Sequence, residues 1–191
     1  MSLFYIHNPI NNELEEVGRD APLPVIIQDA AVVYTRYPVV ATCTAVTNAG
    51  AYDASDNVGG VMKLPYVLDG PRRMGYLKNV TIIDKNNQKA QLEAIVFQYQ
   101  PTAGTYTDDA NITLGTDARF IVARIPIAAA DYATIGVGDT PDVAIGYVNL
   151  NDRPVVGDAN GTLWIVVMCV ATPTYASTAD LDFIWGIDKM I

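Results

Sequence analysis

The chain is poor in charge and especially poor in positive charge. Only 17% of its 191 residues are charged, just 12 are lysine or arginine, and the formal net charge is -9. Neutralising a phosphate backbone requires clustered cations, so this composition argues against a nucleic-acid partner. Anionic membrane surfaces likewise attract basic segments, so we expect no membrane partner.

Cysteine and histidine are equally scarce. Cys43 and Cys169 are the only cysteines, and the apolar run "LWIVVMCVA" around Cys169 favours a buried side chain over a disulfide. His7 is the only histidine, so a Ser or Cys triad would lack its usual base. These three residues also lack zinc-ligand spacing. We therefore expect no catalytic residue, no metal and no cofactor, and a protein that is not an enzyme.

Long apolar stretches and secretory features are missing as well. The longest apolar run, at 163–171, is far shorter than the roughly 20 residues that a membrane-spanning helix needs. The opening "MSLFYIHNPINNELEEVG" has no basic segment followed by an apolar one. We expect a soluble protein without a secretory signal, made in a reducing cytoplasm.

What the sequence does contain, from residue 25 onward, is short β-rich runs separated by Gly, Pro, Asn and Asp. Half of the residues are hydrophobic, so a core can form without covalent cross-links. This pattern predicts an all-β domain. The predicted strands occupy 25–35, 37–46, 60–67, 76–84, 89–100, 119–127, 142–150, 162–172 and 181–188.

Two of these strands differ in their hydrophobic pattern. Leu181, Phe183, Trp185 and Ile187 fall on one face of a strand, and its other face includes Asp182, Gly186 and Asp188. This pattern predicts a strand that covers the core with one face and leaves the other wet. By contrast, "LWIVVMCV" at 163–170 is apolar on both faces. That pattern predicts a strand in the middle of a sheet, covered on both sides or in contact with a second subunit.

The stretch "TIIDKNNQKAQLEAIVFQYQP" is the most regular in the chain. Val80 and Ile82 share one face, Leu92, Ala94 and Val96 share a face on the return, and "KNNQ" has the composition of a turn. We interpret it as a β-hairpin. Its far end, "AIVFQY", loses the alternation, which predicts burial on both sides beneath a second sheet or a neighbouring subunit.

Residues 1–24 differ from the rest of the chain. They show no strand pattern, contain the acidic cluster "ELEE", and join the body through Pro22 and Pro24. We interpret them as an extended N-terminal arm, and a frayed terminus is the alternative. The expected organisation is an arm at 1–24 and a β-sandwich domain at 25–191.

Two acidic loops are the places where a metal could bind. Calcium prefers hard oxygen ligands from such loops, although an EF-hand loop beginning at Asp158 would place its closing ligand at Cys169. The alternative is that these residues only form turns. The candidates are Asp108, Asp109, Asn111 and Asp117 in one loop, and Asp152, Asp158 and Asn160 in the other.

Few other side chains suggest chemistry. Glu93 is the only glutamate of the predicted sandwich, so a glycosidase-type carboxylate pair would need an aspartate as its second member. Arg72 and Arg73, in "DGPRRMG", are interpreted as a surface turn, with a contact to an acidic partner as the alternative.

Aromatic residues offer a further set of candidates. Trp164 and Trp185 are predicted to lie in the core because of their apolar neighbours and strand phase. Four tyrosines near loops and strand ends are the better candidates for contacts, since tyrosine is enriched at interfaces. They are Tyr99, Tyr106, Tyr147 and Tyr175.

Several stretches, taken in order, resemble the capsid decoration, or cement, proteins of tailed bacteriophages. They are "VMKLPYVLDG", "GYLKNVTIIDKNNQKAQLEAIVFQYQPT", "ARFIVARIPIAAADYATIGVGDT" and "LWIVVMCVATPTYASTADLDFIWGID". The resemblance covers about residues 25–188 and depends on the order of these stretches, since none is a catalytic signature. The turn "DGPRRMG" departs from the small Gly- and Ser-rich turn expected there, which leaves a partner contact at that loop in doubt.

The resemblance implies a jelly-roll-like antiparallel β-sandwich that forms a dimer or trimer on the outer surface of the virion. Its arm would bind neighbouring subunits of the major capsid protein. We therefore expect a structural protein that stabilises the assembled phage head. The alternatives are a carbohydrate-binding or fibre- or tail-associated module, a head-completion role, and a small hydrolase with an aspartate-based site.

Overall fold

A computed structural model describes residues 5–7, 14–16, 35–69, 73–136 and 143–190. The chain divides into two units, Met1–Val33 and Tyr34–Ile191. The predicted domain boundary at 24/25, and the predicted strand at 25–35 except for Thr35, lie outside the described residues.

The first unit contains an antiparallel pair of short strands, β1 (Tyr5–His7) and β2 (Leu14–Glu16). The expectation that residues 1–24 contain no strand is therefore wrong. A strand of three residues is too short to show an alternating pattern, so neither strand could be predicted from periodicity.

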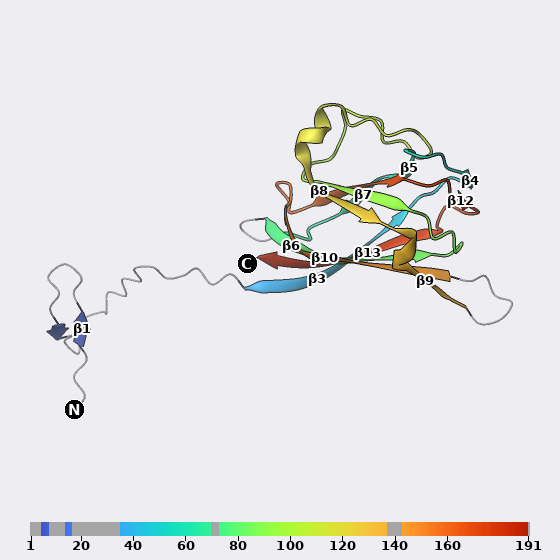
Figure 1. Ribbon diagram of the computed structural model, residues 1–191. Coiled ribbons are helices and arrows are strands. Elements are labelled where there is room, and N and C mark those ends of the chain that lie inside the picture. The colour runs from blue at the N-terminus through green and yellow to red at the C-terminus, as the bar shows by residue number, and fades with distance from the viewer. Residues whose placement is uncertain (1–4, 8–13, 17–34, 70–72, 137–142, 191) are drawn as a thin grey trace. The chain divides into compact units, whose positions relative to one another are not determined.

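The second unit is made of two large antiparallel sheets, which form the two layers visible in Figure 1. The five-stranded sheet has the order β3 (Arg36–Ala45), β13 (Leu181–Met190), β6 (Met74–Asp84), β10 (Val143–Val156) and β9 (Tyr132–Ile135). The four-stranded sheet has the order β5 (Asn57–Leu64), β11 (Leu163–Cys169), β7 (Leu92–Phe97) and β8 (Ile121–Ile127).

The order of the long strands is that of a jelly roll. Eight long strands remain when the short strands β4, β9 and β12 are left out, and we count them along the chain from β3 as the first to β13 as the eighth. In the five-stranded sheet these long strands lie in the order first, eighth, third, sixth. In the other sheet the order is second, seventh, fourth, fifth. The predicted all-β, jelly-roll-like antiparallel sandwich is thus confirmed.

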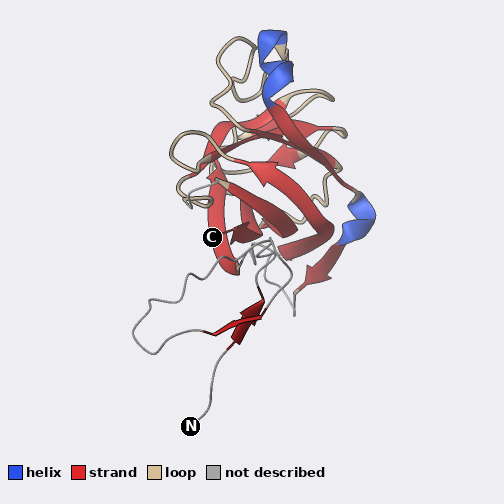
Figure 2. Ribbon diagram, turned by 90° about the vertical axis from the view of Figure 1, so that its left-hand side faces the viewer, coloured by secondary structure: helices blue, strands red, loops and turns tan. Residues whose placement is uncertain are grey.

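The short elements were not predicted. β4 (Gly50–Ala51) pairs with β12 (Thr174–Tyr175), and β9 adds a fifth strand beside β10. Two 3-10 helices, η1 (Gly115–Phe120) and η2 (Ala129–Asp131), lie at the periphery of the strands, as Figure 2 shows.

The core lies between the two sheets. Phe183 and Trp185 of β13 are fully buried, as the alternation of that strand predicted, and they belong to the same cluster as Ile165 of β11. β11 lies between β5 and β7, which confirms the prediction that the strand apolar on both faces is in the middle of a sheet.

The predicted hairpin at 81–101 is wrong. β6 pairs with β13 and β10, whereas β7 pairs with β11 and β8, so the connecting turn carries the chain from one sheet to the other. The buried carboxylate of Asp84 accepts hydrogen bonds from the backbone N–H groups of Asn86 (3.0 Å) and Lys89 (2.8 Å) in this turn. Alternation shows which face of a strand is buried, but it does not identify the neighbouring strand.

The outer face of the four-stranded sheet is covered by the loop 98–120, which includes η1. A second apolar cluster there contains Ile95 and Phe97 of β7, Val166 of β11 and Tyr106 of the loop. The predicted burial of this strand on both faces is confirmed for residues 94–97. The five-stranded sheet covers the inner face of these residues, as predicted, and the loop 98–120 of the same chain covers their outer face.

Candidate functional site

The acidic residues predicted as calcium ligands hold the loop 98–120 in place. Asp108 accepts hydrogen bonds from the hydroxyl of Tyr52 (2.8 Å) and the backbone N–H of Gly59 (2.6 Å). Asp109 accepts one from Nδ2 of Asn48 (3.1 Å). These bonds connect the loop to the segment around β4 and to β5.

Asp117 is buried within the same loop. Its carboxylate accepts hydrogen bonds from the backbone N–H of Ala103 (2.6 Å) and from the hydroxyl of Tyr106 (3.0 Å). Asn111 forms an isolated antiparallel bridge with Asp56. The loop is therefore fixed both by its own carboxylates and by the apolar cluster beneath it.

The other acidic loop is organised in the same way. Asp158 accepts hydrogen bonds from the backbone N–H groups of Asn160 (2.8 Å) and Thr162 (3.0 Å), as a turn-forming aspartate does. It also accepts one from the indole N–H of Trp164 (3.4 Å). Trp164 is half-buried and packs against the second cluster, whereas Asp152 takes part in ion pairs on the five-stranded sheet.

The described residues bring no reactive constellation together. Among them, no group of three or more His, Cys, Asp or Glu side chains is placed to hold a metal ion. Glu93 forms a bidentate ion pair with Arg124, at 2.5 and 2.8 Å, so its partner is a cation and not a second carboxylate. His7 lies on β1, Arg72 lies outside the described residues, and Arg73 is exposed just before β6.

Both cysteines are buried and free. Burial raises the pKa of each thiol to about 12, because the thiolate loses its hydration in the core. Neither thiol is therefore suited to act as a nucleophile near neutral pH.

The four candidate tyrosines do not form one surface. Tyr106 and Tyr175 are buried and pack edge-on against Phe97 (ring centroids 6.0 Å apart) and Tyr52 (5.8 Å), so the expectation that they make external contacts is wrong. Tyrosine is amphipathic, and the apolar environment of these two rings determined their position. Tyr99 and Tyr147 are exposed.

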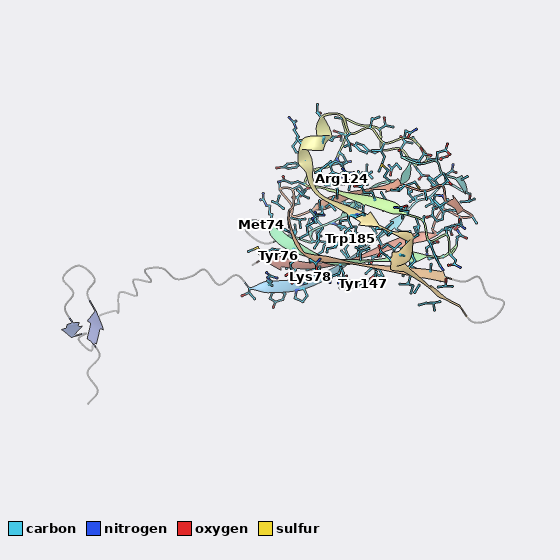
Figure 3. All side chains as sticks on the ribbon, in the orientation of Figure 1. Met74, Tyr76, Lys78, Arg124, Tyr147 and Trp185 are labelled. Carbon is cyan, nitrogen blue, oxygen red and sulfur yellow. The ribbon has the colours of Figure 1, made fainter. Side chains whose placement is uncertain are left out.

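Exposed apolar side chains gather instead on the outward side of the five-stranded sheet. Val40 of β3 has 74% of its surface exposed, and Tyr147 of β10 has 55%. Figure 3 shows Tyr147 on the side of the sheet away from the buried Trp185. The exposed Met74 and Ile135 also belong to strands of this sheet.

The strand register aligns these side chains in rows. One row runs across Thr42, Ile184, Thr81 and Tyr147. The next runs across Val40, Gly186, Asn79 and Asn149. We call these eight residues the centre of the open face. None of them carries a charge.

Gly186 keeps the centre of the open face flat. A Cβ atom at this position would come within 2.8 Å of Oδ1 of Asn79, which shows that the amide of Asn79 lies over the glycine. The exposed Val40 is the register partner of Gly186 on β3.

Ion pairs lie at both ends of the open face. At one end Asp152 pairs with Arg36 (2.7 Å) and with Lys78, which also approaches Asp188 (3.8 Å). Hydrogen bonds from Lys78 and Arg36 lower the pKa of Asp152. At the other end Lys85 pairs with Asp182 at 3.0 Å. These six residues, which we call the rim, contribute three positive and three negative charges.

The chain matches no protein-family model and no curated protein. Within the described part of the chain, neither helix is long and apolar enough to cross a membrane. The open face is the most distinctive surface of the described residues, and it is suited to contact with another macromolecule.

Proposed function

We propose that this chain is a structural virion protein, a capsid decoration or cement protein that binds the assembled phage head from outside. The observation that carries the proposal is a jelly roll whose larger sheet leaves Val40 and Tyr147 exposed on its outer face, in rows of uncharged residues. Such a face is typical of assembly, because uncovered apolar area on a soluble domain is usually covered by a partner. The sequence resemblance over 25–188 supplies the virion context.

Stabilisation of the shell follows from selective binding. A protein that binds assembled major capsid protein, and not its dissociated form, shifts the equilibrium toward the shell. At a free concentration about 100-fold above its Kd, each bound site contributes about 2.7 kcal/mol. Many copies on one shell add up to a large effect without any chemical reaction.

The proposal gives the N-terminal arm, residues 1–24, the role of binding neighbouring capsid subunits. An extended segment can add a strand to an exposed sheet edge, so that backbone hydrogen bonds provide affinity and side chains provide register. Protease digestion tests this role. The arm should be cut readily in the free protein and protected on particles, and equal cleavage in both would contradict it.

The decisive experiment is addition of the purified full-length chain to phage heads that lack it. We expect many bound copies spread over the shell, counted by mass spectrometry, and a higher temperature of shell disruption. A chain without residues 1–24 serves as the control and should bind more weakly. Binding of only a few copies at one vertex would instead indicate a tail or head-completion role.

A carbohydrate-binding role is the second candidate. Tyr99 is 43% exposed, and its ring lies edge-on against Phe120 with centroids 5.1 Å apart. Exposed aromatic rings of this kind can stack on sugars. A glycan array separates the two roles: reproducible binding that is lost in Tyr99→Ala would favour carbohydrate recognition over capsid decoration.

A further inference from the structure

We propose that the free edge of β3 binds an extended, uncharged segment of another protein, which adds a strand to the five-stranded sheet beside β3. The site is the row of backbone N–H and C=O groups along the margin of the sheet, and it is distinct from the open face. The inference does not rest on the virion role.

β3 (Arg36–Ala45) is the outermost strand of the five-stranded sheet. Within the described residues it pairs on one side only, with β13. Alternate residues of an antiparallel strand direct their N–H and C=O groups to opposite sides, so about half of these groups on β3 point away from β13. Such a row of backbone groups is a template on which another strand can pair.

The three other edge strands of the sandwich carry features that oppose strand addition. β9 has only four residues. β5 contains the exposed Lys63, and its register with β11 contains a shift. β8 contains the exposed Arg124 and also Pro126, and its register with β7 is interrupted as well. Short length, charge, proline and bulges are the means by which proteins keep edge strands from pairing.

β3 lacks most of these protective features. All ten of its residues pair with β13 without a register shift, and Arg36 at its start is its only charged residue. Pro38 is the single exception. Tyr37 is 55% exposed and Val40 is 74% exposed, and the two lie on opposite faces because successive side chains alternate. A strand added beside β3 would therefore cover apolar surface on both faces of the sheet.

The end of β3 near Ala45 limits the length of the site. A Cβ atom at Gly59 would lie 2.5 Å from Cβ of Ala45, so β5 runs close to β3 at this end. The part of β3 that precedes Ala45 remains available for a segment of about six residues, which is the usual length of a strand.

Backbone geometry and charge select the occupant. Pairing along an edge requires an extended polypeptide, whose backbone supplies the hydrogen bonds. Residues 37–45 carry no charge, so a charged side chain held opposite them would lose hydration without a counter-charge. A second copy of the chain is disfavoured, because each copy has a net charge of -9 and the two would repel one another. An uncharged segment of another protein avoids both penalties.

Fluorescence anisotropy with a labelled peptide tests the site on the full-length chain. The probe is a capped peptide of about six residues that alternates valine with threonine. It should bind saturably below about 1 mM. The same peptide methylated on every backbone nitrogen should bind at least about tenfold more weakly, because it has lost its hydrogen-bond donors. Hydrogen exchange followed by mass spectrometry should show slower exchange of the β3 amides with the unmethylated probe only.

Lysine substitutions locate the bound peptide. Tyr37→Lys and Val40→Lys should each weaken binding at least about tenfold, because charge on an edge strand opposes pairing. The matched controls are Tyr147→Lys on the open face and Ile135→Lys on the edge strand β9, and both should bind the probe as the wild type does. All four positions are exposed. Thermal unfolding followed by circular dichroism verifies that the variants are folded.

Four results would overturn the inference. The first is no binding of the probe up to about 1 mM, and the second is equal binding of the methylated peptide. The third is binding that Tyr147→Lys abolishes and Tyr37→Lys leaves intact, which would place the peptide on the open face. The fourth is a dimer of the chain alone, seen by sedimentation velocity, that Tyr37→Lys dissociates. That result would assign the edge of β3 to a second copy.

Discussion

The two sheets of the sandwich share one core but differ on their outer faces. The four-stranded sheet is covered by the loop 98–120, which packs Tyr106 and neighbouring apolar residues over Phe97 and Val166. The five-stranded sheet leaves Val40 and Tyr147 exposed to solvent. The described residues therefore bury both faces of the four-stranded sheet, whereas they leave these side chains on the outer face of the five-stranded sheet exposed.

The strands of the two sheets differ accordingly in sequence. β11 and residues 94–97 of β7 are apolar on both faces, because each has a core side and a covered side. β13 alternates strictly, because only its inner side meets the core. The covered sheet thus gains stability from two apolar layers, and the exposed one retains surface for binding.

The largest difference between the sheets should appear when a large outer-face side chain is removed. Phe97→Ala leaves a cavity beneath the loop and should lower the free energy of unfolding by about 3–5 kcal/mol. Tyr147→Ala, measured at a dilution where the chain is monomeric, should change it by less than about 1 kcal/mol. Urea denaturation measures both. Similar losses for the two variants would show that the outer faces are equally buried.

The stability of the loop 98–120 should depend on the buried carboxylate of Asp117. Asp117→Ala leaves the N–H of Ala103 and the hydroxyl of Tyr106 without their acceptor, so it should lower the free energy of unfolding by about 2 kcal/mol. Limited proteolysis should then cut within 98–120. Asp131→Ala is the control, because the half-buried Asp131 accepts a hydrogen bond from the N–H of Ala128 at the edge of the other sheet. Resistance of the loop in Asp117→Ala would contradict its role.

A smaller loss of stability is expected from a substitution at the centre of the open face. Gly186→Ala requires only the Asn79 side chain to move, so thermal denaturation should show a loss of less than about 1 kcal/mol. Gly161→Ala is the contrasting change, because Gly161 has a φ of +69° and its Cβ would lie 2.3 Å from the backbone of Leu68. That variant should lose more than about 1 kcal/mol. A large loss in Gly186→Ala would indicate that the open face is rigidly packed.

The smallest difference between the two sheets is expected in the reactivity of the cysteines on their inner faces. Cys43 of β3 and Cys169 of β11 both have pKa values raised by burial from about 9 to about 12. Both thiols should therefore react with Ellman's reagent near neutral pH only as fast as the protein unfolds. Faster reaction of Cys43 would show that β3, at the edge of its sheet, opens separately.

Ionisation of the same two thiols makes the free energy of unfolding depend on pH. The neutral thiol is favoured in the folded protein, and the unfolded chain ionises at lower pH. The stabilisation from each thiol is thus complete below pH 9 and is lost as the pH rises toward 12. Denaturation at a series of alkaline pH values measures this decline, and replacing both cysteines by alanine should reduce its slope.

The predictions from sequence were most accurate where a residue's own neighbours decide its environment. The alternation of 181–188 predicted the buried face of β13, and the apolar run at 163–170 predicted the central position of β11. Trp185 and Cys169 are buried as expected, whereas Trp164, which was also predicted to lie in the core, is half-buried. The sequence could not show whether the candidate calcium ligands bind a cation or only form turns. An aspartate that accepts backbone hydrogen bonds occurs in the same kind of loop sequence as one that binds a cation.

The amino-acid sequence by itself determined which faces of the main strands are apolar, because this follows from residue type and period. Only the tertiary structure decided that β6 and β7 belong to different sheets, that the loop 98–120 covers β7, and that the side chains of the open face align. The physical reason is that strand pairing and covering are long-range contacts. Their partners are distant in sequence, and no local pattern specifies which of several apolar surfaces will meet.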